Sequence, residues 1–476
     1  SVLPAGAAPV IWQGNTNGDW STGSNWDTGT APTSGDNAYL PASPAPGTKD
    51  IVLGASAAAN YLFVEDAGYT LGSGNLTLAN QLWIQRALGT STLTLAEGGS
   101  ITAPNATLSA DDGKQGTLTL DSTLGSVGLD VSAGTLTLGG AGDNAGVTLV
   151  GGTGNNATLS AGTILLGVNA SSTSNGLQTV SGDVGTTITT GSLVVGVDGT
   201  YNSVLMSGGQ LAVTGSSDVE LGHSASSNGN VVTIGDVSYA AAFSAVKNVV
   251  VGNAGSSNYF AVQEGSTATS GGLRLGVDAA STNNVAGVSN GASWTMNDGT
   301  ARVGDRGDSN FFAVVDGTAT LTGAGKNFYV GYYDTASDNV ALVVGSGVLN
   351  VKASGADVVV SANVSSGVPG AASTGNKLIV NSSGTIDANR VLVGSGGTLG
   401  GGYISGLVKG NVLVGDGGTV SPGDPVFAMD PIGTLTIQGD LDLSPSVYPY
   451  TNQHGTLAID IAGSTIDQIS VTGLLN

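Results

Sequence analysis

The residues of this chain that could carry out chemistry are few and far apart. The two histidines, His223 and His454, lie 231 positions apart (454 minus 223). His223 follows a recurring glycine where neighbouring repeats carry Val197 and Asn253, so a surface turn is its expected place. Cysteine is absent, which excludes thiol nucleophiles, thiolate metal ligands and disulfide bonds.

Two arginines and two aspartates come nearest to an enzyme site. Polysaccharide lyases need an Arg or Lys base beside acidic metal ligands on one face. Arg274 and Arg302 hold equivalent repeat positions, but Asp278 and Asp305 follow their repeat glycines by two residues and by one, and so do not share a register. We expect no catalytic residues, and a polysaccharide-degrading enzyme ranks third among the functional interpretations.

Short acidic turns raise two further possibilities. Arg306-Gly307-Asp308 matches an integrin-binding tripeptide, but three-residue matches arise by chance and a turn is the preferred interpretation. Turns such as Asp198-Gly199 could hold Ca²⁺ loosely, without the nonapeptide spacing of a Ca²⁺-binding β-roll. We expect no cofactor and no metal site, with loosely bound Ca²⁺ left open.

Composition limits the partners. Twelve basic residues against 34 acidic ones give a net charge of −22, and no basic stripe exists to bind nucleic acid. No run of 18 apolar residues occurs, so no membrane insertion of this segment is expected. With 79 glycines in 476 residues and only 10% charged residues, the chain is too apolar for disorder and too Gly-rich for helices.

The sequence contains a repeat built from asparagine, glycine and alternating apolar residues. An asparagine followed by alternating apolar residues recurs eight times, at Asn175, Asn202, Asn230, Asn258, Asn284, Asn310, Asn339 and Asn376. Apolar-x-apolar-Gly precedes seven of them, with the glycine at 167, 196, 222, 252, 276, 304 and 331. The intervals from glycine to asparagine are 8, 6, 8, 6, 8, 6 and 8 residues, always even, which keeps each asparagine on the same face of an extended chain.

The period predicts the fold class. Successive glycines are roughly 27 residues apart, and a third apolar run completes many repeats, so three short strands form each turn of an all-β, right-handed parallel β-helix (a solenoid). At this period the chain would make about 16 or 17 coils, with almost no α-helix.

The position two residues before the glycine is variable and is expected to point outward. Glu220, Arg274 and Arg302 occur there, and we expect weak surface pairing among them, with no function.

The asparagines have two interpretations. Eight in register favour a ladder in which each amide bonds to those of the coils above and below. Alternatively, each asparagine tolerates a left-handed turn. Either role is architectural.

The N-terminus carries motifs of a known kind. Trp12-Gln13-Gly14, Gly18-Asp19-Trp20-Ser21, Asn25-Trp26 and Pro32-Thr33-Ser34-Gly35-Asp36 resemble the opening of autotransporter-associated β-strand-repeat proteins, which are secreted by bacteria. Gly418 to Asp424, Gly433 to Asp440, Leu457 to Ile461 and Asp467 to Gly473 resemble the closing passenger segment of these proteins. Trp12, Trp20 and Trp26 suit a cap over the first coil, which a solenoid needs.

We therefore expect three parts: a Trp-rich cap over 1–45, β-helix repeats over 46–410 and a passenger-like β segment over 411–476. A start at Ser1 fits an export signal already removed, although an artificial boundary would look the same. The preferred function is a secreted or cell-surface rod that assembles head to tail into a surface or biofilm-matrix filament; the alternative is a monomeric adhesin or passenger stalk that binds a cell-surface glycan or protein.

The filament hypothesis names its ends. Val10 and Ile11 have no repeat partner of their own, and Ile469, Val471 and Leu474 lie in the last strand-like segment. An unpaired strand at one end of a β-helix is a template for the strand of another copy, so these residues are the expected assembly ends.

Overall fold

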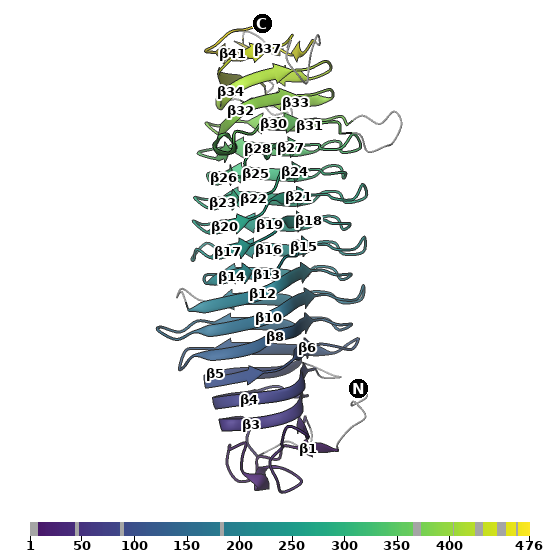
Figure 1. Ribbon diagram of the computed structural model, residues 1–476, viewed down its shortest axis with the longest axis vertical. Helices are drawn as coiled ribbons and strands as arrows, with labels where there is room; N and C mark the ends of the chain where they lie inside the picture. The colour runs from purple at the N-terminus through teal and green to yellow at the C-terminus, as the bar shows by residue number, and fades with distance from the viewer. Residues whose placement is uncertain are drawn as a thin grey trace. The chain divides into compact units, whose positions relative to one another are not determined.

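The computed structural model describes residues 8–42, 47–85, 90–180, 185–364, 373–402, 404–423, 432–444, 454–462 and 465–476. The chain is an all-β parallel solenoid of about 14 turns with about 28 residues per turn, which confirms the predicted fold class (Figure 1). Helical structure in these ranges is limited to two short 3-10 turns, Gly23–Asn25 and Lys352–Ser354.

The expected 16 or 17 coils are too many. The residues between β1 and β2 form a cap and not a coil. Because the cap contributes no turn, and because each turn takes about 28 residues and not 27, dividing the whole length by the expected period overestimates the number of coils.

Two compact units divide the chain: residues 1–217 with 222–244, and residues 218–221 with 245–476. Unit 1 contains β1 (Pro9–Ile11), β2 (Asn37–Leu40), β3 (Asp50–Val64), β4 (Tyr69–Ile84), β5 (Thr90–Thr102), β6 (Asn105–Leu108), β7 (Gln115–Asp121), β8 (Val127–Leu138), β9 (Gly146–Val150), β10 (Ala157–Leu166), β11 (Gly176–Val180), β12 (Thr186–Val195), β13 (Ser203–Ser207), β14 (Gln210–Val213) and β16 (Val231–Ile234). β17 (Ala242–Ala245) contains the division in the sequence.

Unit 2 begins with three columns of short strands. The first column is β15 (Val219–Leu221), β18 (Val249–Val251), β21 (Leu273–Leu275), β24 (Ala301–Val303), β27 (Phe328–Val330) and β30 (Val358–Val360). The second is β19 (Tyr259–Val262), β22 (Val285–Ser289), β25 (Phe311–Val315), β28 (Val340–Val344), β31 (Asn376–Val380), β33 (Gly397–Gly400), β35 (Thr419–Ser421) and β38 (Thr456–Leu457). The third is β20 (Thr267–Ser270), β23 (Ser293–Met296), β26 (Thr318–Leu321), β29 (Val348–Asn350), β32 (Thr385–Val393), β34 (Gly406–Val414), β36 (Thr434–Gln438) and β41 (Gln468–Val471).

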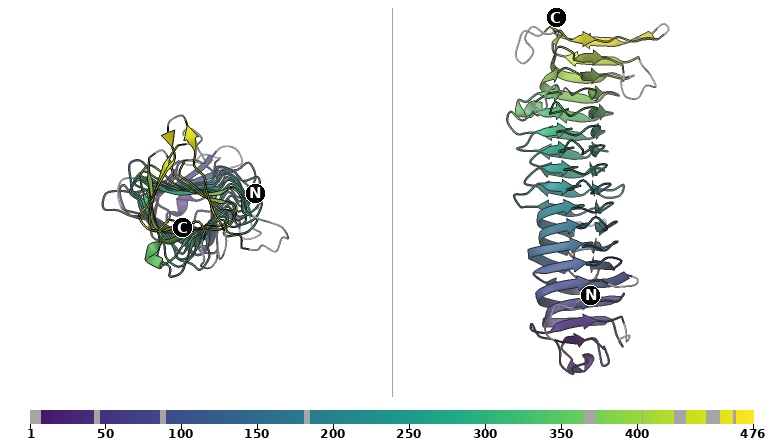
Figure 2. Two further views of the ribbon diagram at one scale, coloured as in Figure 1. Left: turned by 90° about the horizontal axis from the view of Figure 1, so that it is seen from above. Right: turned by 90° about the vertical axis from the view of Figure 1, so that its right-hand side faces the viewer.

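β32 and β34 are long enough to take part in the first column as well as the third. Three further strands complete unit 2. These strands are β37 (Leu441–Asp442), β39 (Ile461–Ala462) and β40 (Thr465–Ile466). β39 and β40 form an antiparallel hairpin, which Figure 2 shows in yellow, projecting from its coil.

Strands of one column pair in parallel without offset, so equivalent residues stack. In the first column of unit 2, Val249 pairs with Leu273, Leu273 with Ala301, and Ala301 with Phe328. In strands such as β21, β23 and β26, alternate residues are buried, because side chains alternate between the interior and the outer face. The even repeat spacing therefore places one apolar row above another.

Aromatic rings fill part of the interior of unit 2. Phe260, Trp294, Phe312 and Phe328 are fully buried, and successive ring centroids are 4.9, 6.4 and 5.4 Å apart. The Nε1–H of Trp294 donates to Ser270 Oγ at 3.0 Å, which satisfies the one polar atom of the ring in this core.

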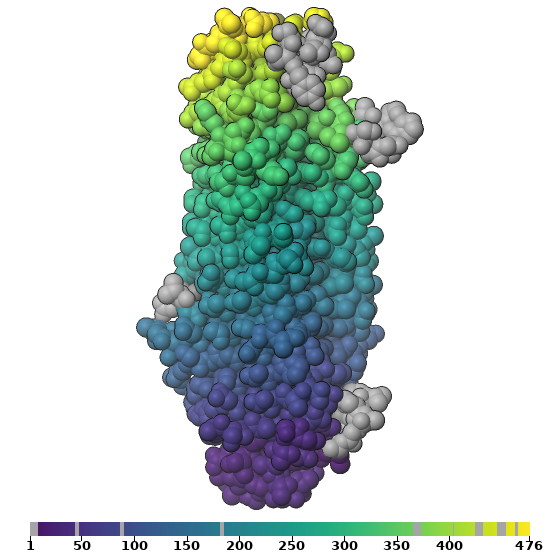
Figure 3. Space-filling view, in the orientation of Figure 1, coloured from purple at the N-terminus to yellow at the C-terminus, as the bar shows by residue number. Residues whose placement is uncertain are grey.

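The N-terminal tryptophans pack on one another at the end of unit 1, which Figure 3 shows in purple. Trp26 contacts Trp12 and Trp20 edge to face, with ring centroids 5.0 and 4.8 Å apart, and all three side chains are at most 2% exposed. Trp12 Nε1 donates to the carbonyl of Thr48 at 2.8 Å, and Trp26 Nε1 donates to that of Trp20 at 2.8 Å. These residues cover the first strands as a solenoid cap does.

The first strand already has partners on both sides. β1 pairs in parallel with β2, and Trp12 forms an antiparallel bridge with Trp26. The N–H of Ile11 donates to Asp27 Oδ1 at 2.8 Å, and the carbonyl of Ile11 accepts the N–H of Asp27 at 3.0 Å. Val10 is only 7% exposed. The expectation that Val10 and Ile11 lack a partner is therefore wrong.

The C-terminal segment continues the solenoid. β34 runs across the expected boundary at 410/411, and β36 pairs with β34 and then with β41. Ile469 pairs with Leu435, and Val471 with Ile437. Residues 1–7 of the expected cap, its boundary near 45 and Asp424 of the closing motif lie outside the described residues.

We expect Trp26→Ala to destabilise the N-terminal end of unit 1 by about 3 to 5 kcal/mol, because it removes the ring that contacts both other tryptophans. Hydrogen exchange of β1 and β2, followed by mass spectrometry, measures this loss as faster local opening. Tyr201→Ala, at a tyrosine that is 68% exposed, is the control and should leave those strands protected. Equal exchange in both variants would contradict a packing role for Trp26.

Candidate functional site

The eight repeat asparagines are all fully buried. Asn175, Asn202 and Asn230 lie in unit 1; Asn258, Asn284, Asn310, Asn339 and Asn376 lie in unit 2. Within each unit, they stack from one coil to the next and form an asparagine ladder.

Each ladder step uses the same hydrogen bonds. The Oδ1 of Asn310 accepts both the backbone N–H of Asn284, at 3.1 Å, and its Nδ2–H, at 3.0 Å. Asn310 in turn donates both groups to Asn339 Oδ1, at 2.9 and 3.1 Å. The carbonyl of Asn284 accepts the N–H of Phe311 at 2.9 Å. One side chain therefore satisfies two donors that burial would otherwise leave without a partner.

The ladder ends are satisfied by other groups. Asn175 Oδ1 accepts the backbone N–H of Ala145 at 2.9 Å. At the far end of the unit 2 series, Asn376 Nδ2 donates to the carbonyl of Ala336 at 2.8 Å and to Ser361 Oγ at 3.1 Å.

The turn interpretation fails, because the left-handed residue is the one before each ladder asparagine. The eight residues in that position have φ between 55° and 71°; they are Ser174, Tyr201, Gly229, Ser257, Asn283, Ser309, Asp338 and Gly375. This single left-handed residue turns the chain, and the asparagine that follows points inward.

The repeat glycine is fitted to the asparagine of the next coil. Gly304 has φ of +72°, and a Cβ there would stand 2.2 Å from Asn339 Nδ2. Gly276 has φ of +62°, and its Cβ would stand 2.2 Å from Asn310 Nδ2. A side chain at this position would thus both strain the backbone and displace the ladder. The repeat glycine therefore contacts the repeat asparagine of the neighbouring coil and not that of its own coil.

A serine three residues before Asn175, Asn230 and Asn284 adds another connection. Ser281 Oγ lies 2.7 Å from the carbonyl of Gly252 and 2.6 Å from that of Gly255, and it accepts Asn284 Nδ2–H at 3.0 Å. Ser172 and Ser227 do the same in unit 1. These serines occur where the interval from repeat glycine to asparagine is eight residues. Where the interval is six residues, a glycine occupies the equivalent place. The alternation of 8 and 6 therefore marks a two-coil repeat, which the sequence analysis missed.

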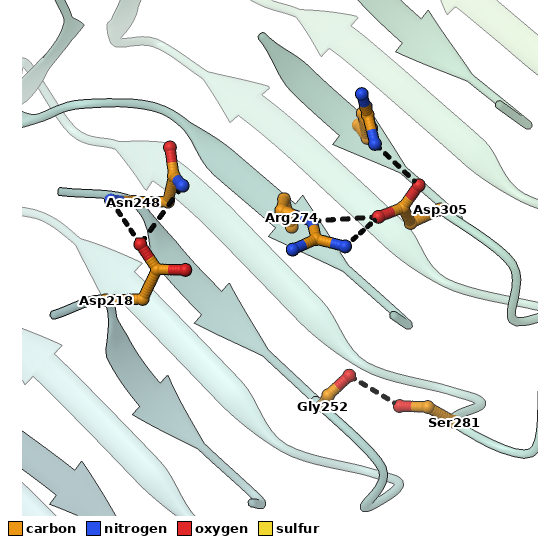
Figure 4. A network of polar contacts seen from close by, with 7 residues as sticks. Asp218, Asn248, Gly252, Arg274, Ser281 and Asp305 are labelled. Atoms are coloured by element: carbon orange, nitrogen blue, oxygen red, sulfur yellow. Dashed lines mark hydrogen bonds and ion pairs between the residues drawn. The ribbon is translucent and has the colours of Figure 1, made fainter. Parts of the chain in front are cut away.

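Glu220, Val250, Arg274 and Arg302 lie in one lateral row, as expected. The described ion pairs of the two arginines are with Asp305, which lies outside this row. Both arginines converge on Asp305, which follows Gly304 and whose side chain is 1% exposed (Figure 4). Arg302 belongs to the same repeat as Asp305, and Arg274 belongs to the preceding one. Arg274 donates from Nε and Nη2 to Asp305 Oδ2 at 2.8 and 2.6 Å, and Arg302 Nη1 donates to Oδ1 at 3.0 Å. Glu220 accepts a hydrogen bond from Asn253 Nδ2 at 3.3 Å.

Tyrosines surround these arginines. The guanidinium of Arg302 lies 3.7 Å from the ring centre of Tyr332, and that of Arg306 lies 4.8 Å from the ring centre of Tyr333. Tyr332 also meets Tyr329 and Tyr333 edge to face, each at 4.8 Å. We call Arg274, Arg302, Arg306, Tyr329, Tyr332 and Tyr333 the arginine–tyrosine patch. It forms because the loop after each glycine folds back over the preceding coil.

The two aspartates considered as metal ligands, Asp278 and Asp305, lie in different surroundings. Asp305 already accepts three N–H donors, and Asp278 is exposed in a different part of its turn. The Arg306-Gly307-Asp308 tripeptide is held in place, since Asp308 Oδ1 accepts the N–H of Ser337 at 2.7 Å and Gly307 is buried.

The histidines stand apart from the patch. His223 is exposed at its turn, and the exposed His454 contacts Ser444 Oγ through Nδ1 at 3.0 Å. Within the described ranges, no group of three or more His, Cys, Asp or Glu side chains is placed to hold a metal ion, and no helix is long and apolar enough to cross a membrane.

Comparison with known proteins adds little. No protein-family model matches the chain, and neither does any curated protein. A match among solved structures is the crystal structure of a TibA fragment hyper-glycosylated by TibC, at 12% identity over 91% of this chain and 100% of that chain. Its TM-score is 0.21, so the match carries no argument about this chain.

We expect Asn310→Leu to destabilise unit 2 by about 1 to 3 kcal/mol, because Asn284 loses the acceptor for its N–H and Nδ2–H. Asn310→Asp should also destabilise, since a buried carboxylate cannot donate to Asn339 Oδ1. Chemical denaturation followed by circular dichroism measures both. Asn297→Leu, at an exposed asparagine, is the control. Equal tolerance of all three substitutions would refute the ladder.

The two-coil repeat can be tested by removing its serine at one position and adding one at an equivalent position. Ser281→Ala should cost about 1 kcal/mol, because Asn284 and two carbonyls lose a partner. Ala336 occupies the serine position of the last turn of eight residues, above Gly304 and Gly307. Ala336→Ser should therefore stabilise unit 2, by about 0.5 to 1.5 kcal/mol. A loss of stability from Ala336→Ser, measured in the same denaturation experiment, would contradict this repeat.

Proposed function

We propose that the chain is a non-enzymatic structural stalk of a bacterial surface or extracellular matrix, which presents its lateral face for adhesion. The main support for this proposal is that the buried polar side chains of the repeat bond to neighbouring coils. The ladder amides, the turn serines and Asp305 all bond to the neighbouring coil, and none is aimed into a cavity. Such residues hold coils together; they do not prepare a reaction.

The proposal favours the adhesin or stalk over the head-to-tail filament. A filament of the expected kind needs a free strand edge at each end of the molecule. The N-terminal edge is engaged, because Ile11 uses both its N–H and its carbonyl with Asp27. Secretion is part of the proposal and rests on the resemblance of the end motifs.

Assembly remains the second candidate because of the C-terminal coil. In the part of the chain that the structure describes, β41 pairs on one side only, with β36. Exposed apolar side chains stand near it: Ile461 is 72% exposed, Leu474 65% and Leu475 59%. An open strand edge beside apolar residues can pair with a second copy.

Sedimentation velocity and electron microscopy of the purified chain distinguish the two candidates. A stalk is expected to remain monomeric across a hundredfold range of concentration and to show single elongated particles. Filaments that grow with concentration, and that Leu474→Asp with Leu475→Asp abolishes, would establish assembly and overturn the stalk. Ile404→Asp, at another exposed apolar residue, is the matched control.

A further inference from the structure

We propose that the arginine–tyrosine patch of unit 2 binds a sugar that carries a carboxylate, as found in uronic acid polymers. This inference rests on the proposed function, since it names the adhesive contact of the stalk. It is argued from three features of the patch: its departure from the rest of the outer face, its guanidinium groups and its partly exposed rings.

The outer face of the first column does not need polar residues. Arg274 and Arg302 stack in register with Val250 on one side and with Tyr329 and Val359 on the other. Val250 is 2% exposed and Val359 is 7% exposed, so a folded-back loop covers an aliphatic residue well. Leu392 and Leu413 continue the row at 6% each. Coils therefore stack in this row with either an aliphatic residue or an arginine at the outer position.

The patch gathers three guanidinium groups. Two guanidinium groups share the single carboxylate of Asp305, and Arg306 adds a third cation on the same turn. Arg274 and Arg302 are 33% and 21% exposed. Among the described contacts, no hydrogen bond uses Nη1 of Arg274 or Nη2 of Arg302, which leaves planar N–H donors for a ligand. Guanidinium donors of this kind match a carboxylate.

A single carboxylate fits this patch better than a polyanion. The chain as a whole has a net charge of −22, which repels a densely charged polymer at long range. At physiological salt this repulsion fades over about 8 Å, so a short ligand that touches the arginines directly escapes most of it.

The tyrosines supply the second half of a sugar site. Tyr332 and Tyr333 are half-buried, and their rings stand at 85° to each other. Tyr329 meets Tyr332 at 78°. A partly exposed tyrosine ring can offer its remaining apolar surface to the C–H groups of a pyranose, while a carboxylate on the pyranose reaches the guanidinium groups.

Isothermal titration calorimetry with trigalacturonate tests the site, with its methyl ester and dextran sulfate as the two comparison ligands. We expect trigalacturonate to bind and the ester to bind at least tenfold more weakly. Arg274→Met and Tyr333→Ala should each weaken binding about tenfold. Arg390→Met is the matched control, because Arg390 is 34% exposed and bonds Asp357 through Nε and Nη2 without an aromatic neighbour.

Several outcomes would overturn the site. These are no binding of trigalacturonate, equal binding of the ester, equal binding of dextran sulfate, or an Arg390→Met effect as large as that of Arg274→Met. Circular dichroism melts show whether Arg274→Met folds, and Tyr333→Ala tests the site without touching the Asp305 ion pairs. If the sugar does not bind, the stalk proposal still stands, because that proposal is tested separately by sedimentation and electron microscopy.

Discussion

The contact on which the structure depends is the one between a buried asparagine and the repeat glycine of the preceding coil. The amide fills the space that a Cβ at Gly304 would need, and its Oδ1 serves two donors of the coil before it. A buried amide left without partners costs more than an ordinary hydrogen bond gains. Each coil therefore stacks stably only when the next coil is in register, and this makes the repeat cooperative along each unit.

Outside the core, the coils are joined by residues that differ from coil to coil. Arg274 with Asp305 is an ion pair, Arg302 with Tyr332 is a cation–π contact, and Asn253 with Glu220 is a hydrogen bond. Each pair joins the residue after a glycine to the outer face of the preceding coil. Because a charged or aromatic residue would meet the wrong neighbour after a slip of one coil, such pairs also oppose errors of register.

The first and last described strands differ in how far their edges are paired and buried. The tryptophan cluster buries the first strands, and Asp27 occupies the edge of β1. At the other end, β41 has one partner strand and apolar residues beside it are exposed. The N-terminal strands are therefore buried by other side chains of the chain, whereas exposed apolar residues stand beside the C-terminal strands.

The sequence by itself determined the repeat, the all-β class and the common face of the asparagines, because period-two alternation and even spacing act through local geometry. The pattern of 8 and 6 residues was also visible, although its meaning needed Ser281 to be seen against Gly252 and Gly255. Only the tertiary structure decided that Arg274 meets Asp305 and that Ile11 is already paired. These contacts depend on the path of irregular loops, which fold over a neighbouring coil and follow no periodic pattern that a sequence displays.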